Sequence, residues 1–164
     1  MSNENKIKLL MVDDEVKFLE SISKRLALKG IDVIATSNGE DAIAAAENDL
    51  FDVAVVDFQM PGMDGAQVLK ALKDKHKYLE IIMLTGHATV DSAVECTKLG
   101  AFNYLEKPYA FEKLVETITE AYEARLKKKF EHNQTRIEEI QKLSISSSPL
   151  GLLRALAQLD DKEK

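Results

Sequence analysis

Acidic side chains follow two apolar runs of this chain, at points where they could hold a cation. Asp13 and Asp14 come directly after the run at 8–12, and Asp57 follows the run at 53–56. Three carboxylates brought within several Å of one another repel strongly unless a cation lies between them. Hard oxygen ligands select Mg²⁺ rather than zinc. These residues therefore predict a site for Mg²⁺.

Two further polar residues end later apolar runs. Thr85 follows the run at 81–84, and Lys107 comes after the run at 103–105. A hydroxyl donor and a positive charge complete a site for phosphate oxygens. Each residue alone has an ordinary structural interpretation, since acids before a helix are often N-caps and a Lys before Pro is usually solvated. Because Asp13, Asp14, Asp57, Thr85 and Lys107 all occur at the ends of predicted strands, a functional site is favoured over these separate structural interpretations.

The elements that must position these residues are short strands and amphipathic helices. Runs rich in Val, Ile, Leu and Met predict strands, and their near-continuous hydrophobicity indicates burial on both faces of a parallel sheet. About 120 residues with five alternations of strand and helix are typical of a doubly wound α/β domain. The functional crevice of such a sheet lies beyond the carboxyl ends of its strands. The predicted strands are 8–12, 32–35, 53–56, 81–84 and 103–105, and the predicted helices include 18–28, 41–47 after an N-cap at Asn38, 68–72, 90–99 and 111–122.

Four motifs, in order along the chain, resemble one known family. They are Val-Asp-Asp-Glu at 12–15, Asp-Phe-Gln-Met-Pro-Gly-Met-Asp-Gly at 57–65, Thr-Gly-His-Ala at 85–88 and Tyr-Leu-Glu-Lys-Pro at 104–108. Together they resemble the CheY-like receiver domain of two-component response regulators, over about residues 6–125. The resemblance implies a flavodoxin-like, five-stranded parallel sheet of order 2-1-3-4-5, with helices on both faces.

The resemblance also implies a role for each acidic residue. Asp57 would be the phosphoacceptor that attacks the phosphohistidine of a sensor kinase, a step in which a carboxylate is the nucleophile. Asp14 would ligate Mg²⁺ together with Asp57 and the main-chain carbonyl of Gln59, and Asp13 would act through a bound water or by orienting its neighbours. The side chains of Gln59 and His87 match positions that flank the attacking water, and we assign neither a catalytic role.

The remaining implied roles concern the phosphoryl group and the switch. Lys107 would pair with the acceptor carboxylate before the reaction and with the phosphoryl group after it, and Thr85 would donate its hydroxyl to a phosphoryl oxygen. Tyr104 matches the family's switch aromatic and would turn inward on phosphorylation. We expect a cis peptide between Lys107 and Pro108. The alternatives are that Tyr104 only packs on a helix and that the Lys107–Pro108 bond is trans.

The function implied is that of a single-domain response regulator. A receiver at 6–125 would accept a phosphoryl group from a sensor histidine kinase or a phosphotransfer protein and would signal through protein contact. The downstream partner would meet the face made by the fourth helix, the fifth strand and the fifth helix, or the C-terminal helices. Two alternatives are a scaffold that works without phosphorylation and an aspartyl-phosphate phosphatase. The intact acidic cluster argues against the scaffold, and Gln59 stands where a phosphatase needs a second acid.

Residues 126–164 predict a helical C-terminal extension without a recognisable output domain. Apolar residues spaced roughly by heptads continue the fifth helix, with Asn133 in the same seam, and a final amphipathic helix is predicted at 149–159. Three interpretations stay open: a dimerising coil, a helix that docks on the receiver or in a partner's groove, and a frayed tail. The residues of the seam are Leu126, Phe130, Asn133, Ile137 and Ile140.

Composition limits the other classes of function. A net charge of −6 argues against a nucleic-acid-binding body, because phosphate backbones favour clustered Lys and Arg. A single cysteine, Cys96, suits a reducing compartment and should pack as a small apolar residue. We find neither a signal-peptide pattern nor a membrane-length apolar run, so we expect a cytoplasmic protein. The cognate kinase, the process controlled and the oligomeric state cannot be read from the residues.

Overall fold

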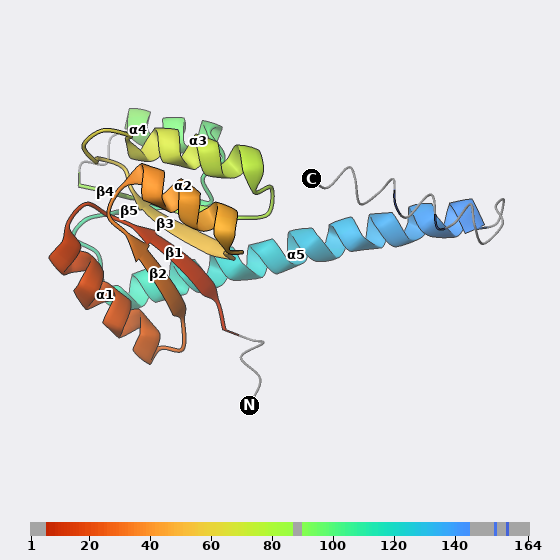
Figure 1. Cartoon of the computed structure of the whole chain (residues 1–164), viewed down its shortest axis with the longest axis horizontal. Coiled ribbons are helices and arrows are strands. Elements are labelled where there is room, and N and C mark those ends of the chain that lie inside the picture. Colours follow the sequence, from red (N-terminus) through yellow and green to blue (C-terminus); the bar gives the residue numbers. More distant parts are fainter. Residues whose placement is uncertain (1–5, 87–89, 145–152, 154–156, 158–164) are drawn as a thin grey trace. The chain divides into compact units, whose positions relative to one another are not determined.

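The computed structural model describes residues 6–86, 90–144, 153 and 157 of the chain (Figure 1). Five strands alternate with five helices in the order that the sequence predicts. The strands are β1 (Lys8–Val12), β2 (Asp32–Thr36), β3 (Val53–Asp57), β4 (Glu80–Thr85) and β5 (Asn103–Glu106). The helices are α1 (Val16–Leu28), α2 (Gly39–Asn48), α3 (Gly65–Lys75), α4 (Val90–Lys98) and α5 (Phe111–Ser144).

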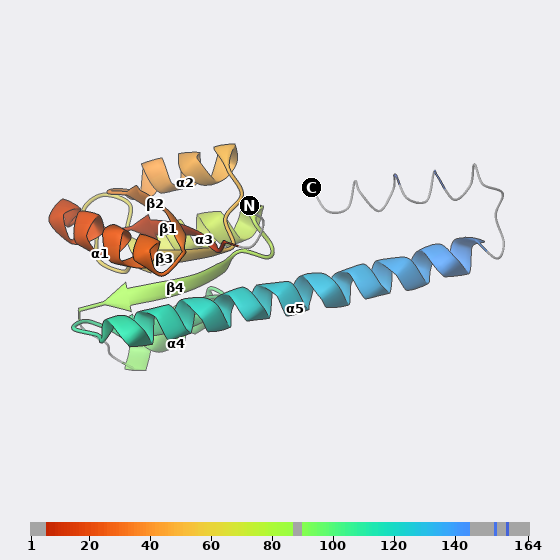
Figure 2. The same cartoon turned by 90° about the horizontal axis from the view of Figure 1, so that it is seen from below.

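The strands form one parallel sheet of order β2-β1-β3-β4-β5. This order confirms the predicted flavodoxin-like topology. The strand order reverses between β1 and β3, which is where a doubly wound sheet opens its crevice. The arrowheads of β1 and β4 in Figure 2 point to the same end of the sheet. The residues that follow those strands are therefore brought to one edge.

Side-chain caps fix where two of the helices begin. Asn38 precedes α2, and its side chain accepts a hydrogen bond of 2.8 Å from the backbone N–H of Asp41, as predicted. Asp64 caps α3 in the same way, and Gln67 bonds back to the backbone of Asp64 in a full capping box. The second cap was not predicted, and it fixes the start of the helix that follows the Asp57 loop.

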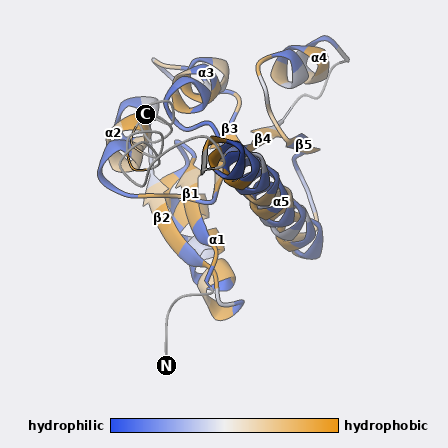
Figure 3. Ribbon diagram, turned by 90° about the vertical axis from the view of Figure 1, so that its right-hand side faces the viewer, coloured by the Kyte–Doolittle hydropathy of each residue, from blue (hydrophilic) through white to orange (hydrophobic). Residues whose placement is uncertain are grey.

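The helices cover both faces of the sheet, as predicted. Helices α2, α3 and α4 contribute to one apolar cluster, and α1 and the first turns of α5 contribute to the other. Figure 3 shows hydrophobic residues on the central strands and on one side of the helices. Cys96 is buried in the first cluster, and burial raises the pKa of its thiol. It packs as the small apolar residue that we expected.

Strand β2 differs from the prediction of burial on both faces. Its central residue Ile34 is 40% exposed, and Asp32 and Ala35 are exposed as well. The reason is its position, because β2 is an edge strand that pairs only with β1 within the sheet. Strand β3, in the middle, is buried at every residue. An apolar run indicates a strand, but it does not say whether neighbours cover that strand on both sides.

The chain divides into two compact units, residues 1–125 and 126–164. Helix α5 continues past Arg125 to Ser144, as the heptad spacing predicts. Beyond the boundary most of its apolar residues are exposed, by 47% at Leu126, 62% at Phe130 and 46% at Ile137, whereas Ile140 is half-buried. Of the final helix predicted at 149–159, all residues except Leu153 and Ala157 lie outside the described part. Within the described ranges, no helix has both the length and the apolar character needed to cross a membrane.

Candidate functional site

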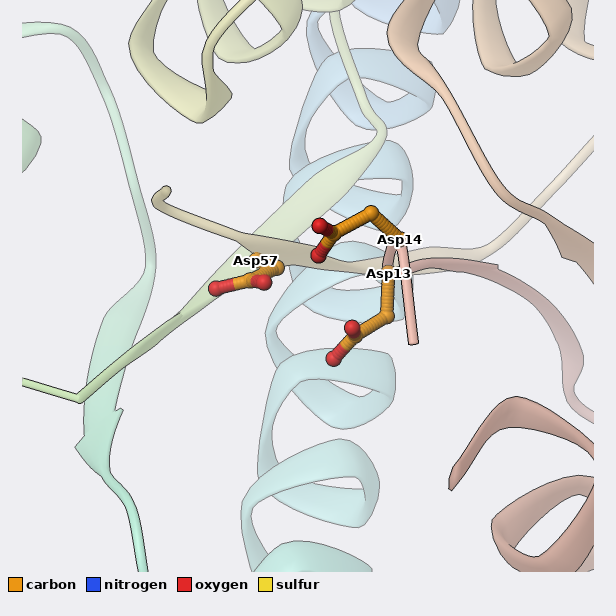
Figure 4. Close-up of side chains that lie close together, drawn as sticks. All are labelled: Asp13, Asp14 and Asp57. Atoms are coloured by element: carbon orange, nitrogen blue, oxygen red, sulfur yellow. The ribbon is translucent and has the colours of Figure 1, made fainter. Parts of the chain in front are cut away.

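The three predicted acids meet at the carboxyl end of the sheet. Asp13 and Asp14 follow β1, and Asp57 ends β3. One carboxylate oxygen from each of them lies within 4.8 Å of the others, and Figure 4 shows the three side chains converging. Asp13 is fully buried and Asp57 is 6% exposed, whereas Asp14 is open to solvent. The three carboxylates thus form one cluster with a single exposed member.

Backbone hydrogen bonds fix the loops that carry these acids. The N–H of Asp13 donates to the carbonyl of Thr36 at the end of β2, and its Oδ1 accepts a bond of 2.9 Å from the N–H of Glu15 before α1. After Asp57, the N–H of Phe58 donates to Leu84 of β4. Asp13 is therefore anchored at both its backbone and its side chain, and the β3 end is tied to the neighbouring strand.

Lys107 brings a positive charge to the cluster. Its Nζ lies 2.9 Å from Oδ2 of Asp13, with which it forms a hydrogen bond, and 3.8 Å from Oδ2 of Asp57. The resemblance implied pairing with the acceptor Asp57, so the nearer partner differs from that expectation. Burial is the largest single influence and lowers the pKa of Lys107, but the hydrogen bond to Asp13 and the negative charges of Asp13, Asp57 and Glu15 together leave the pKa raised. The Lys107–Pro108 peptide is cis, as expected.

The pKa of Asp57 is raised to about 6. Burial is the largest cause, and the negative charge of Asp13 adds to it. The ammonium of Lys107 and the N–H of Gln59, 3.4 Å from Oδ1 of Asp57, oppose the shift. The cluster thus carries more negative charge than one ammonium neutralises. An oxygen-only donor set with surplus negative charge suits a hard divalent cation such as Mg²⁺.

The other predicted residues lie around this cluster in different ways. Thr85 ends β4 and is 5% exposed, and its carbonyl accepts a bond of 2.7 Å from the N–H of Lys107. Gln59 follows Asp57 in an exposed position. Tyr104 lies on β5 and is 39% exposed. His87 falls outside the described residues. The structure therefore brings Thr85 and Gln59 to the site edge and leaves Tyr104 on the surface of β5.

Three residues near the site were not predicted as part of it. The ring centroid of Phe18 lies 5.1 Å from Nζ of Lys107, and the ring of Tyr109 meets Phe18 edge-on at 6.4 Å. Gly65 begins α3 so close to β3 that an added Cβ would lie 2.4 Å from the carbonyl oxygen of Asp57. The helix predicted at 18–28 includes Phe18, but the prediction did not indicate its contact with Lys107. The motif at 57–65 ends at Gly65, but it did not indicate which atom Gly65 approaches.

This fold and this acidic edge define a receiver-type signalling domain. A family model described as "Response regulator receiver domain" matches residues 9–119. The chain therefore belongs to the response-regulator receiver family of two-component systems, as the motifs had indicated.

Curated relatives share about a third of the matched residues. The DNA-binding transcriptional regulator NtrC of Salmonella typhimurium is 35% identical over 111 residues, which are 68% of this chain and 24% of the relative. The transcriptional regulatory protein ZraR of the same species is 36% identical over 116 residues, which are 71% of this chain and 26% of the relative. The chain thus spans about a quarter of the length of these relatives.

Solved receiver structures match over nearly their whole length. A CheY-like receiver domain from Methanospirillum hungatei superposes with a TM-score of 0.72 at 28% identity, covering 76% of this chain and 99% of that one. The chemotaxis protein CheY4 of Vibrio cholerae gives a TM-score of 0.68 at 31% identity, and the match covers 71% of this chain and 98% of CheY4. The likeness therefore extends over the receiver unit of this chain.

Proposed function

We propose that this chain accepts a phosphoryl group on Asp57 in a Mg²⁺-dependent reaction and signals by a change of shape. The observation that carries the proposal is the convergence of Asp13, Asp14 and Asp57 within 4.8 Å, with Lys107 at 3.8 Å from Asp57. The donor is a sensor histidine kinase or a phosphotransfer protein, in keeping with the family. The chain acts as a signalling phosphoacceptor and not as an enzyme on external substrates.

The chemistry follows from the positions of the side chains. An oxygen of the ionised Asp57 carboxylate attacks phosphorus, so that an O–P bond forms while the P–N bond of the donor's phosphohistidine breaks and its electron pair stays on the imidazole nitrogen. Lys107 compensates the charge on the transferred group. The hydroxyl of Thr85 donates to a phosphoryl oxygen. Asp13, anchored at both oxygens, keeps Lys107 beside the acceptor.

Three groups would hold the metal: the carboxylates of Asp14 and Asp57 and the main-chain carbonyl of Gln59. Asp13 would contribute through water or by orienting its neighbours. When bound, Mg²⁺ supplies Lewis-acid stabilisation of the charge on the phosphoryl oxygens. Asp14 suits a direct ligand because its carboxylate is exposed, whereas both oxygens of Asp13 already have partners.

The output proposed for this 164-residue chain is protein contact through the α4–β5–α5 face. Tyr104 on β5 is 39% exposed and Val94 on α4 is 45% exposed, so the face has apolar side chains to offer. Tyr104 would turn inward when Thr85 bonds the phosphoryl group. DNA binding, which the name of the NtrC relative states, is not proposed here, since the net charge is −6 and the shared part is the receiver.

A homodimer is proposed through the second part of α5. The exposed seam of Leu126, Phe130 and Ile137 has the four-and-three spacing of a coiled coil, with Asn133 between its apolar members. A second copy offers an identical seam. Two alternatives are that the final helix docks on the receiver or in the groove of a partner protein. A monomeric state in solution would favour these alternatives over the homodimer.

A small phosphodonor tests the proposed function. Acetyl phosphate and Mg²⁺ should add one phosphoryl group to the chain, as read by intact-protein mass spectrometry, and omission of Mg²⁺ or the change Asp57→Asn should abolish the addition. The matched control is Asp64→Asn, which makes the same change at the N-cap of α3. Equal phosphorylation of Asp57→Asn and of the unmodified chain would contradict the proposal.

A further inference from the structure

The ammonium of Lys107 has an aromatic partner besides its two carboxylates. Its Nζ lies 5.1 Å from the ring centroid of Phe18, in the first turns of α1. A cation within about 6 Å of a ring centroid is attracted by the negative face of the ring. Phe18 therefore contributes to where the ammonium rests.

The ring of Phe18 is itself held in place. Phe18 is half-buried against the apolar cluster of α1 and α5, and the ring of Tyr109 packs on it edge-on, with an interplanar angle of 80°. Tyr109 lies two residues after Lys107, and its hydroxyl is buried. One ring of this pair thus comes from α1 and the other from the segment that carries Lys107.

Lys107 needs such support because its position is not fixed by the carboxylates alone. Its side chain is 24% exposed, and rotation about the four side-chain bonds of a lysine could move the charge out to solvent. Asp13 holds the ammonium at 2.9 Å, but the acceptor Asp57 lies at 3.8 Å. A rigid platform on one side keeps the charge within reach of both.

From these contacts we infer that Phe18, supported by Tyr109, is a positioning residue for Lys107 in the phosphorylation of Asp57. Its ring face limits the positions open to the ammonium, so that the charge is already in place when the phosphoryl group arrives. This inference rests on the proposed function. It adds a residue of α1 to a site otherwise built from the ends of β1, β3, β4 and β5.

The test compares three variants of the full chain. Phe18→Leu removes the ring and keeps an apolar side chain, whereas Phe18→Tyr keeps the ring. Phe102→Leu makes the same change in the same apolar cluster, before the start of β5 and so at the other end of that strand from Lys107. Far-ultraviolet circular dichroism verifies that each variant is folded.

Two readouts separate positioning from packing. In the unmodified chain the ε-methylene protons of Lys107 should show an upfield ring-current shift in NMR spectra, and Phe18→Leu should remove it. The rate of phosphorylation by acetyl phosphate should fall on the order of fivefold in Phe18→Leu. Phe18→Tyr and Phe102→Leu should keep both the shift and the rate.

The results that overturn the inference are distinct from those that overturn the proposed function. An unchanged ε-methylene shift in Phe18→Leu, an unchanged rate, or an equal loss of rate in Phe18→Tyr would each show that Phe18 does not position Lys107. An unmodified chain that takes up no phosphoryl group would overturn the proposed function, and with it the positioning role, even if the shift showed the ring contact.

Discussion

At the scale of single residues, the carboxyl group of Asp57 is held in a position that favours its neutral form. Burial and Asp13 raise its pKa to about 6, so the folded chain resists its ionisation. A carboxyl whose pKa is higher in the folded than in the unfolded state adds stability below the unfolded pKa. That contribution is lost as the pH rises through the folded pKa. At neutral pH and without a cation, Asp57 should therefore destabilise the fold.

The change Asp57→Asn should consequently stabilise the metal-free chain. The gain in the free energy of unfolding at pH 7.5 should be up to about 3 kcal/mol, since a tenfold change in an acid constant corresponds to about 1.4 kcal/mol. The gain should vanish below about pH 3, where Asp57 is protonated in both the folded and the unfolded state. Urea unfolding in EDTA at both pH values measures it. A variant less stable than the unmodified chain at pH 7.5 would contradict this account.

The same pKa makes magnesium binding depend on pH. A protonated Asp57 cannot act as a ligand, so protons compete with the cation below about pH 6. The affinity for Mg²⁺ should fall about fivefold from pH 6 to pH 5 and change little between pH 7 and pH 8. Isothermal titration calorimetry at several pH values would follow this, with Asp57→Asn as the control. A flat profile down to pH 5 would mean that Asp57 does not take part in binding.

Asp13 and Asp14 are adjacent but should behave differently when each is changed to Ala. Asp13 accepts bonds from Glu15 and Lys107 and is fully buried, so Asp13→Ala should cost roughly 2 kcal/mol of unfolding free energy in EDTA. Asp14 is exposed, and Asp14→Ala should cost less than about 0.5 kcal/mol. Asp14→Ala should, however, lose the increase in Tm that Mg²⁺ gives the unmodified chain. Thermal unfolding with and without Mg²⁺ measures both effects, and a retained increase would exclude Asp14 as a ligand.

The sequence located the acids better than it located the partners of Lys107. Asp13, Asp14 and Asp57 follow strands whose order and direction bring their ends together, so their convergence follows from topology. The position of the Lys107 ammonium depends instead on its rotamer and on the rings of Phe18 and Tyr109, which no motif marks as part of the site. The contact with Phe18 joins residues far apart along the chain, and no local pattern predicts it.

At the scale of elements, helix α3 is packed directly against the end of β3. A Cβ at Gly65 would meet the carbonyl oxygen of Asp57 at 2.4 Å and Cα of Phe58 at 2.6 Å. Both are backbone atoms, which cannot turn away. The N–H of Gly65 also donates to the carbonyl of Phe58 at 3.0 Å. The absence of a side chain at Gly65 therefore sets the distance between α3 and the acceptor loop.

The change Gly65→Ala should lower the free energy of unfolding by about 2 kcal/mol or more and should slow phosphorylation, because the Asp57 loop must move. Gly86→Ala is the matched control, since a Cβ at Gly86 would meet no atom within 4 Å. Urea unfolding and the rate with acetyl phosphate would be compared for both variants. Equal effects of the two changes would show that the close approach at Gly65 is not limiting.

Strand and helix order could be read from the sequence, but the exposure of each strand could not. Runs of Val, Ile and Leu predicted every strand to within one residue at each end. The run at β2 was nevertheless expected to be buried, although Ile34 is 40% exposed. Burial depends on which strands become edges, and that is a property of the assembled sheet. The heptad spacing after Arg125 correctly predicted that α5 continues.

At the scale of the whole molecule, the exposed seam of α5 should allow two copies to associate. Phe130 is 62% exposed, so Phe130→Glu should leave the receiver folded while placing a charge in the seam. Sedimentation velocity at several concentrations should show weak association of the unmodified chain and a monomer for Phe130→Glu. Thr135→Glu adds the same charge at an exposed position outside the seam and should associate normally. A chain that is monomeric at every concentration would rule out the coil.

The measurement that bears most directly on the central claim is to locate the modified residue. After reaction with acetyl phosphate and Mg²⁺, borohydride reduces an acyl phosphate to an alcohol, which leaves a stable mark on the acceptor side chain. Peptide mapping by tandem mass spectrometry should find this mark at Asp57 and at neither Asp13 nor Asp14. A mark on another residue, or none under conditions in which Mg²⁺ binds, would contradict the claim that Asp57 is the phosphoacceptor.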